Sequence, residues 1–335
     1  MNDQIQISLS DATDLMQSAL TAVDVAEDAA RSVAVALVAA EAEGQVGHGF
    51  SRLADYVAQA RSGKVNRRAN ITTRALYPAS LLTDADCGFA YPALDAALAV
   101  GLPAAREFGI AIMGVTNSHH CGALSVQVEK IARAGLVGLM FANSPKAIAP
   151  WGSHEAVFGT NPIAFSVPRA GTDPLVIDLS LSKVARGKIM AADKAGTEIP
   201  EGWALDADGQ PTTDTKAALD GTMLPIGEAK GTSLALMVEI LTALFTGASL
   251  SHQAGSFFEA EGEPQRVGQT MIALRPGADT GFAARLEGLL KKIEDLEGAR
   301  LPGTRRVDAI KKAQIDGLTV PSRYIALARS LAEAA

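Results

Sequence analysis

The chain has 335 residues, of which 48% are hydrophobic and 20% charged, and its formal net charge is −7. This composition is typical of a globular protein of one large domain or two to three smaller ones, with a sizeable core. Lys and Arg are scattered and aromatic residues are few, which argues against a nucleic-acid partner.

No targeting or membrane segment is expected. The N-terminus lacks a basic stretch followed by an apolar run, and the longest apolar runs, such as 233–245, are too short or too interrupted to span a bilayer. The two cysteines, Cys87 and Cys121, form neither a disulfide framework nor a zinc pattern. We therefore expect a cytoplasmic protein without a membrane partner or a metal site.

The first 63 residues are expected to be helical. Ser8 with Asp11 has the pattern of a capping box ahead of the first helix. A second helix is expected over about 25–42, ending at Gly44. A third is expected over about 53–60, where apolar residues recur at i, i+3, i+4 and i+7, and Ser62-Gly63 gives its stop signal.

From about residue 91 onward, helices alternate with short apolar strands. Helices are expected over 94–108 (with a kink near 101–103), 124–134 and 234–245, and charged helices from about 280 to the end. Strands are expected over 110–115, 136–142, 163–167, 175–177 and 269–274. The alternation predicts α/β layers with the two helical ends packed together. Long Gly- and Pro-rich loops over 145–162 and 198–227 favour a functional role.

Two short motifs contain three of the five histidines: Gly-His-Gly-Phe-Ser-Arg at 47–52 and Asn-Ser-His-His-Cys-Gly at 117–122. Histidine titrates near neutral pH and is the usual proton donor or acceptor in catalysis. Arg52 follows His48 by four residues, and a planar guanidinium suits a carboxylate. The pair indicates proton transfer beside a carboxyl group. The alternative is that His48 only fills a glycine-rich turn.

The dinucleotide fingerprint is absent, because the 47–52 motif has Arg at the third glycine position and follows a helix. A Walker A motif is absent too. Three other segments could hold an anion: Lys230–Ser233 at a helix start, Leu301–Arg306 with two arginines on a glycine turn, and the turn Phe158–Pro162. A structural role fits each of them at least as well.

Taken together, these motifs resemble the malate/L-lactate dehydrogenase type 2 family, which includes ureidoglycolate and sulfolactate dehydrogenases and Δ1-piperideine-2-carboxylate/Δ1-pyrroline-2-carboxylate reductases. The resemblance runs nearly end to end. The segments that carry it are 47–52, 117–123, 149–152, 158–165, 178–180, 186–188, 202–206, 224–231 and 301–306.

The resemblance implies an α/β fold with a non-Rossmann NAD(P)-binding domain on a mostly antiparallel or mixed sheet, plus a helical domain formed by both chain ends. Residues 1–75 with 280–335 would form the helical substrate and dimer domain, and residues 76–279 the NAD(P)-binding domain. It also implies a homodimer.

Site residues follow from the same resemblance. His48 matches the proton donor and Arg52 the substrate-carboxylate arginine. Some members instead use a histidine that matches His120. Thr160 matches a ligand contact. The expected cofactor contacts are His120, Cys121, Gly122, Ala123, Leu124, Asp178, Leu179, Ser180, Ala229, Lys230, Arg305 and Arg306.

The sequence departs from the imine-reducing members at two positions. Those members carry Ser before the turn histidine and Asp after the glycine that matches Gly187, whereas this chain has Gly47 and Lys188. His48 thus has no obvious acidic partner to raise its pKa. Lys188 could take a catalytic role by polarising a carbonyl oxygen, could hold a second acidic group of the substrate, or could face solvent.

We predict an NAD(P)-dependent oxidoreductase, with NADPH slightly favoured, that interconverts a 2-hydroxy acid such as malate, lactate or sulfolactate with its 2-oxo acid by hydride transfer. An alternative is a reductase of cyclic imino acids, which needs the same arginine and hydride and which His119-His120 favours. A third hypothesis is a non-catalytic homologue that binds a small carboxylate or the cofactor.

Overall fold

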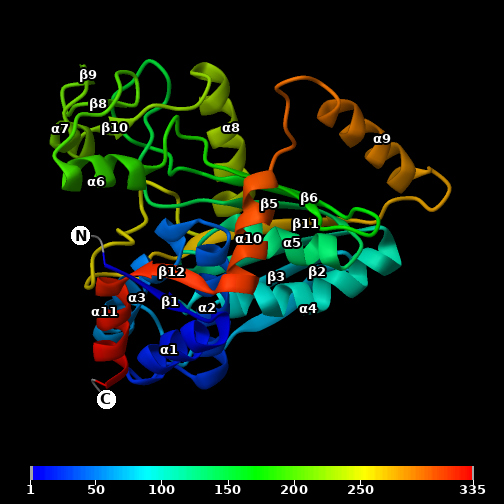
Figure 1. Cartoon of the computed structure of the whole chain (residues 1–335), viewed down its shortest axis with the longest axis horizontal. Coiled ribbons are helices and arrows are strands. Elements are labelled where there is room, and N and C mark those ends of the chain that lie inside the picture. Colours follow the sequence, from blue (N-terminus) through cyan, green and yellow to red (C-terminus); the bar gives the residue numbers. More distant parts are fainter. Residues whose placement is uncertain (1–2, 334–335) are drawn as a thin grey trace.

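A seven-stranded sheet forms the centre of the computed structural model, which describes residues 3–333 (Figure 1). The strands lie in the order β2-β3-β4-β11-β5-β6-β7, and β3 with β4 is the parallel pair. Their bounds are β2 Thr72–Tyr77, β3 Ser80–Asp84, β4 Ile110–Ser118, β5 Val137–Ala142, β6 Ile163–Val167, β7 Leu175–Leu179 and β11 Val267–Leu274. The prediction of a mostly antiparallel, non-Rossmann sheet is confirmed.

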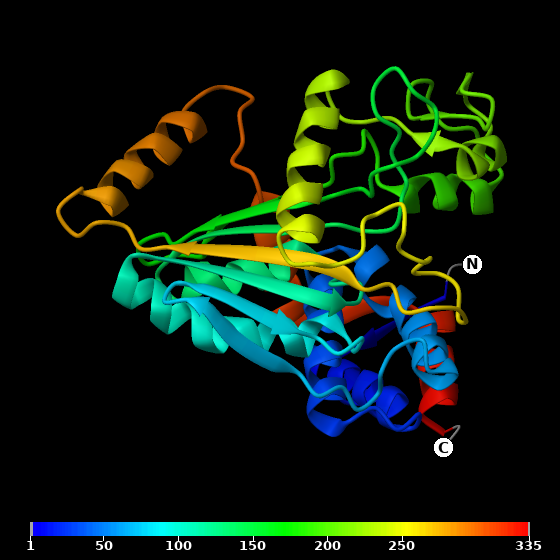
Figure 2. The same cartoon turned by 180° about the vertical axis from the view of Figure 1, so that it is seen from behind.

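Helices cover both faces of this sheet (Figure 2). On one face, α4 (Ala90–Phe108) and α5 (Leu124–Arg133) pack on the central strands, and their apolar side chains form one core with Met113, Met140 and Met271. On the other face lies α8 (Ala229–Glu239), which continues as the π-helical turn η3 (Ile240–Leu244).

Both chain ends meet in one helical unit, as expected (Figure 1). Strands β1 (Gln4–Ile7) and β12 (Leu318–Pro321) pair antiparallel, which joins the ends directly. The helices of this unit are α1 Leu9–Thr21, α2 Glu27–Ala42, α3 Leu53–Ser62 and α11 Ser322–Glu333. The cap at Ser8 is confirmed, because its Oγ accepts a hydrogen bond from the Asp11 main-chain N–H at 3.0 Å.

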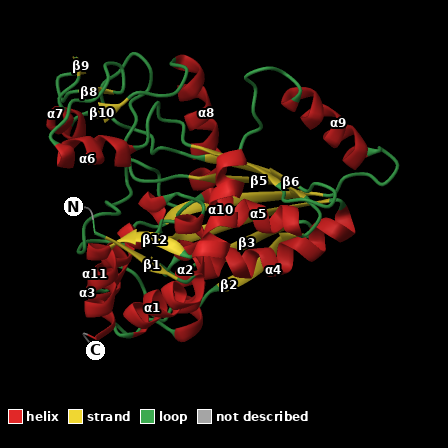
Figure 3. Cartoon of the chain, viewed as in Figure 1, coloured by secondary structure: helices red, strands yellow, loops and turns green. Residues whose placement is uncertain are grey.

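The segment expected as a long loop over 198–227 contains regular elements. A three-stranded sheet and two helices form a small unit of their own beside α8 (Figure 3). Its elements are α6 Arg186–Ala195, β8 Ala204–Leu205, β9 Pro211–Thr212, α7 Thr215–Asp220 and β10 Thr222–Met223. Strands of two residues are too short to show any alternation of apolar and polar side chains.

The C-terminal helices differ in their packing. α10 (Thr304–Asp316) lies on the helical unit, but α9 (Phe282–Glu294) stands apart at the edge of the molecule, with Leu290 as its buried side chain (Figure 1). An ion pair of 2.8 Å between Arg169 and Glu287 holds α9. The division of the chain at residues 75 and 280 stays a prediction.

Within residues 3–333, no helix is both long and apolar enough to cross a bilayer. The same residues contain no group of three or more His, Cys, Asp or Glu side chains that could hold a metal ion.

Gly268 allows η3 to lie on β11, so we expect Gly268→Ala to destabilise the fold. A Cβ at this position would overlap the Thr242 carbonyl oxygen and lie 2.8 Å from Thr246 Oγ1. Overpacking of this kind costs about 1–3 kcal/mol. Urea denaturation measures the loss.

Gly288 in α9 is the matched control, because a Cβ there meets open space. Gly288→Ala should raise the free energy of unfolding by up to about 1 kcal/mol, since alanine is the better helix former. Equal stability of the two variants would contradict the close approach of η3.

Candidate active site

The turn that carries His48 and Arg52 is held by a buried carboxylate. It consists of η1 (Val46–His48) and η2 (Phe50–Arg52), two 3-10 turns between α2 and α3. Glu41 Oε2 accepts a hydrogen bond from the Phe50 main-chain N–H at 2.8 Å and fills the space that a Cβ on Gly49 would need. The second glycine of the motif therefore makes room for Glu41.

Arg52 is positioned with part of its guanidinium free. Its Nε donates to the Gly47 carbonyl oxygen at 2.9 Å, and its Nη1 lies 3.5 Å from Asp55 Oδ2. The guanidinium lies 4.6 Å from the centroid of the Phe258 ring. Its Nη2 makes no hydrogen bond to a residue within 3–333. This nitrogen can therefore bind a carboxylate oxygen.

Asp55 connects this arginine with α6. Burial raises the pKa of the Asp55 carboxyl group, while the charges of Arg52 and Lys194 oppose that rise. Lys194 belongs to α6, so the charge of a second cation, from the small unit, acts on Asp55 beside Arg52.

The two histidine motifs come together. The second motif follows β4, and the rings of His48 and His120 stack with centroids 5.3 Å apart and planes 25° apart. The Phe257 ring lies 4.9 Å from the His120 ring. In both histidines Nε2 reaches solvent and makes no hydrogen bond to a described residue, whereas His48 Nδ1 is buried without a partner. Two imidazole nitrogens are thus available in one place.

Both histidines are neutral at pH 7. Burial, helped by the charge of Arg52, lowers the pKa of His48 to about 4. Burial also holds the pKa of His120 well below its ordinary value, with Arg52 and the neighbouring histidines adding to the effect. Each side chain can therefore donate one N–H as a neutral imidazole.

His119 has a structural position. It is 1% exposed, and its Nε2 lies 2.7 Å from Gln59 Oε1. Gln59 Nε2 in turn donates to the Phe257 carbonyl oxygen at 2.8 Å. His119 and Gln59 therefore hold the segment between η3 and β11 that brings Phe257 and Phe258 to the site.

Sequence reasoning missed several of these residues. Tyr56 and Gln59 lie on α3, where Tyr56 fits the apolar periodicity of a core position. Phe257 and Phe258 lie in a segment with no recognisable motif. The long-range contact with Arg52, which no local pattern records, identifies Phe258 as part of the site.

Two of the expected cofactor segments lie side by side. His120 to Leu124 leads into α5, and Asp178 on β7 accepts a hydrogen bond from the Ser125 main-chain N–H at 2.8 Å. Burial raises the pKa of Asp178, and it raises the pKa of the Cys121 thiol to about 12. Beyond Asp178, Leu179 is 42% exposed and the Ser180 hydroxyl pairs with Ser182.

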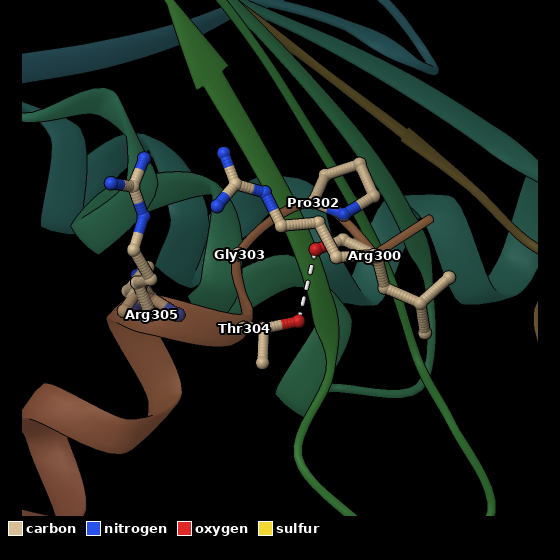
Figure 4. A pocket seen from close by; sticks show the side chains of 7 residues that line it. Arg300, Pro302, Gly303, Thr304 and Arg305 are labelled. Atoms are coloured by element: carbon tan, nitrogen blue, oxygen red, sulfur yellow. Dashed lines mark hydrogen bonds between the residues drawn. The ribbon is translucent and has the colours of Figure 1, made fainter. Parts of the chain in front are cut away.

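The segment 300–306 lines a cavity of about 290 Å³ (Figure 4). The guanidinium groups of Arg300 and Arg305 extend to the same side of it. Gly303 has φ +81°, and a Cβ there would lie 2.7 Å from the Val176 carbonyl oxygen, so glycine is needed. Two cations at the start of α10 fit a phosphate group.

Arg306 points elsewhere. It forms buried ion pairs with Glu43 and Glu129, and its side chain is 11% exposed. These pairs occupy the guanidinium that the sequence had suggested for a phosphate, whereas the exposed Arg305 and Arg300 remain available.

The other expected site residues lie outside this contact network. The Thr160 main-chain N–H donates to Ser144 Oγ at 3.0 Å, Lys188 is exposed on α6, and Ala229 and Lys230 are exposed in the first turn of α8. Within residues 3–333, no hydrogen bond or ion pair joins them to His48, Arg52 or His120.

The sheet lacks the Rossmann order, and a cationic loop stands at a helix start, as suits a nicotinamide-dependent oxidoreductase of a non-Rossmann class. The model of the malate/L-lactate dehydrogenase family matches residues 7–327. The chain belongs to this family. The NADP(+) named for one relative agrees with the predicted use of NAD or NADP.

Individual relatives cover almost the whole chain. A (2R)-3-sulfolactate dehydrogenase (NADP(+)) from Chromohalobacter salexigens is 50% identical over 95% of this chain and 96% of its own. A Δ1-pyrroline-2-carboxylate/Δ1-piperideine-2-carboxylate reductase from Pseudomonas putida is 37% identical over 96% and 95%. The crystal structure of Δ1-piperideine-2-carboxylate reductase from Pseudomonas syringae matches with a TM-score of 0.93 at 34% identity, over 98% and 99% of the two chains.

We expect stability to fall as the pH is lowered, partly through His119. Burial lowers the pKa of His119 to about 3, below the ordinary value of 6.5. Between these values the unfolded chain binds a proton that the folded chain does not, so the free energy of unfolding falls as the pH drops from about 6.5 toward 3. Denaturation of wild type and His119→Gln at several pH values measures the slope.

The free energy of unfolding of His119→Gln should fall less steeply over that pH range, even if this variant is less stable at pH 7. An unchanged slope would mean that His119 is charged in the folded state.

Proposed function

We propose that this protein interconverts a 2-hydroxy acid that carries a second acidic group with the corresponding 2-oxo acid, using NADPH, and that 3-sulfolactate is the leading substrate. The observation that carries the proposal is the free Nη2 of Arg52 beside two neutral histidines whose Nε2 atoms reach solvent. A carboxylate held by Arg52 brings the adjacent carbonyl oxygen within the range of an imidazole N–H.

Each residue then has a distinct task. Arg52 holds the carboxylate, and the His48–His120 pair moves the proton to or from the substrate oxygen, with His48 as the predicted donor. The nicotinamide cofactor supplies the hydride when it is bound. Phe257 packs on the His120 ring and Phe258 on the Arg52 guanidinium, which limits the access of water to this side of the site.

Two observations support a second acidic group on the substrate. The 50% identical relative acts on 3-sulfolactate, which carries both a carboxylate and a sulfonate. Helix α6 carries Lys188 and Lys194, and the charge of Lys194 acts on Asp55 beside Arg52. A lysine ammonium suits a sulfonate oxygen as a point charge.

Reduction of a cyclic imino acid is the second candidate, and relatives that reduce such substrates favour it. Gly47 and Lys188 replace the Ser and Asp that the imine-reducing members use around their histidine, which favours the hydroxy acid. A panel of 3-sulfopyruvate, oxaloacetate, pyruvate and Δ1-pyrroline-2-carboxylate, each with NADPH and NADH, tests both candidates. A higher kcat/KM for the imine than for every 2-oxo acid would overturn the main proposal.

We expect Arg52→Lys to weaken substrate use far more than cofactor binding. A point ammonium cannot reproduce the fork of hydrogen bonds, and its loss costs about 2–5 kcal/mol, or at least roughly 25-fold in kcat/KM. Steady-state kinetics together with NADPH titration separates the two effects. Arg61→Lys, an exposed change on the following helix α3, is the control. A KM for the acid that barely moves would remove Arg52 from the substrate site.

For the cofactor, we propose that Arg300 and Arg305 bind the 2′-phosphate of NADPH, since both line the cavity and neither has an acidic partner among the described residues. Arg305→Ala should raise the Kd for NADPH about tenfold or more and change that for NADH little, because NADH lacks this phosphate. Arg285→Ala, exposed on α9, is the control. An equal loss for both cofactors would place Arg305 at another part of the dinucleotide.

We also propose a cytoplasmic homodimer. Both cysteines are free thiols, which suits a reducing compartment. An apolar row on the outer face of α8 and η3 leaves Leu236 49%, Ile240 46% and Leu244 62% exposed. Such a row suits burial against a second copy.

The variant Leu236→Asp/Leu244→Asp should therefore shift the protein from dimer to monomer in light scattering at micromolar concentration, because it places charges in an apolar contact. Ile315→Asp, at an 83% exposed position on α10, should leave the mass unchanged. A wild-type monomer, or a double variant that stays dimeric, would contradict the assignment of this face.

A further inference from the structure

Behind His120 lies a buried chain of two tyrosines. Tyr56 Oη is 2.6 Å from His120 Nδ1 and 3.0 Å from Tyr91 Oη. Tyr56 and Tyr91 are 1% and 2% exposed, so no water reaches this side of the imidazole. The chain therefore ends at Tyr91, whose hydroxyl group bonds to Tyr56 and to no other described residue.

The closed end of this chain fixes its direction. If His120 Nδ1 carried the proton, it would donate to Tyr56, Tyr56 would donate to Tyr91, and the Tyr91 O–H would have no acceptor. A buried donor without a partner is costly. In the opposite direction, Tyr91 donates to Tyr56 and Tyr56 donates to Nδ1, which leaves every proton with an acceptor.

We propose that Tyr56, with Tyr91 behind it, is a positioning residue that holds His120 in the tautomer with its proton on Nε2, the nitrogen that faces the site. His120 then presents a donor N–H to the site, as the partner of His48 in proton transfer, without being an imidazolium. This inference rests on the proposed function for its catalytic meaning, but the tautomer is a property of the resting protein.

His48 shows the contrast. Its Nδ1 is buried without any partner, so nothing among the described residues selects its tautomer. Of the two stacked histidines, only His120 is oriented by a hydrogen bond to the ring nitrogen remote from the site.

The glycine of the second motif supports the same arrangement. Gly122 has φ +66°, and a Cβ there would overlap the Tyr91 hydroxyl group. The position two residues after His120 must therefore stay small for Tyr91 to reach Tyr56. The packing of Tyr91 thus explains why the His-His-Cys-Gly motif ends in glycine.

The charged and titratable groups around His120 are Arg52, His48 and His119, together with the two tyrosines. A hydrogen bond from Tyr56 to Nδ1 stabilises the neutral imidazole, as does the nearby Arg52 charge. Loss of the Tyr56 hydroxyl group should thus raise the pKa of His120, while the other groups stay in place.

Histidine-selective ¹⁵N NMR of the whole protein without substrate tests the proposal. In the wild type, His120 should show a protonated Nε2 and an unprotonated Nδ1. Tyr56→Phe keeps the ring packing. In this variant the ¹⁵N chemical shifts of His120 Nδ1 and Nε2 should move toward the values of a mixture of both tautomers. Tyr91→Phe should shift them in the same direction but less, since Tyr56 can still donate. Tyr77→Phe, at a 73% exposed position, is the control.

Kinetics gives the second measurement. Tyr56→Phe should lower kcat by about 10-fold or more, a part of the roughly 10²–10⁴-fold that general acid catalysis supplies. The acid limb of the pH profile should move to higher pH, and the Kd for NADPH should stay within about twofold of wild type.

A wild-type His120 with its proton on Nδ1, or a tautomer that neither tyrosine variant changes, overturns the proposal. If Tyr56→Phe does not fold, the shift in Tyr91→Phe decides the question. An altered tautomer with unchanged kcat and pH profile would overturn the catalytic part. Failure of every substrate in the panel would instead contradict the proposed function and leave the tautomer result intact.

Discussion

The buried ion pairs of Arg306 with Glu43 and Glu129 join the parts of the molecule on which the site depends. Glu43 ends α2 just before the His48 turn, Glu129 lies in α5 just after the His120 motif, and Arg306 begins α10 beside the cationic loop. Removing one partner of such a cluster would leave a buried charge uncompensated, at a cost of about 3–5 kcal/mol. The His48 turn, the start of α5 and the cationic loop are thus held in one geometry by buried charges.

Burial sets the chemistry of the histidine pair. Both rings lie among aromatic side chains from α3 and from the segment between η3 and β11, next to the fixed charge of Arg52. Desolvation and a nearby cation both disfavour the imidazolium form. We therefore propose that proton transfer in this site uses neutral imidazoles, and that the hydrogen bond to the second ring nitrogen decides which nitrogen donates. The tyrosine chain serves His120, whereas His48 Nδ1 has no hydrogen-bond partner among the described residues.

Carboxylates inside the protein serve as scaffolding. Glu41 holds the His48 turn through the Phe50 N–H, Asp178 meets the start of α5 through the Ser125 N–H, and Glu239 accepts hydrogen bonds from Asn161 and Ser251. In each case a carboxylate satisfies N–H or O–H donors of a loop or helix start that has no partner in regular secondary structure. Irregular segments are thereby fixed firmly enough to position functional side chains.

The sequence by itself determined the family, because motif residues and turn glycines are local signals. The mostly antiparallel sheet and the roles expected of His48 and Arg52 followed from the resemblance to that family. The sequence did not contain the pairing of β1 with β12, the strands of the small unit, or the positions of Tyr56, Phe257 and Arg300 in the site. These depend on contacts between residues far apart in the chain. Likewise, the segment 301–306 contains two neighbouring arginines that local sequence cannot tell apart. Only the tertiary structure distinguishes them, because glutamates at the end of α2 and in α5 pair with Arg306 and leave Arg305 exposed.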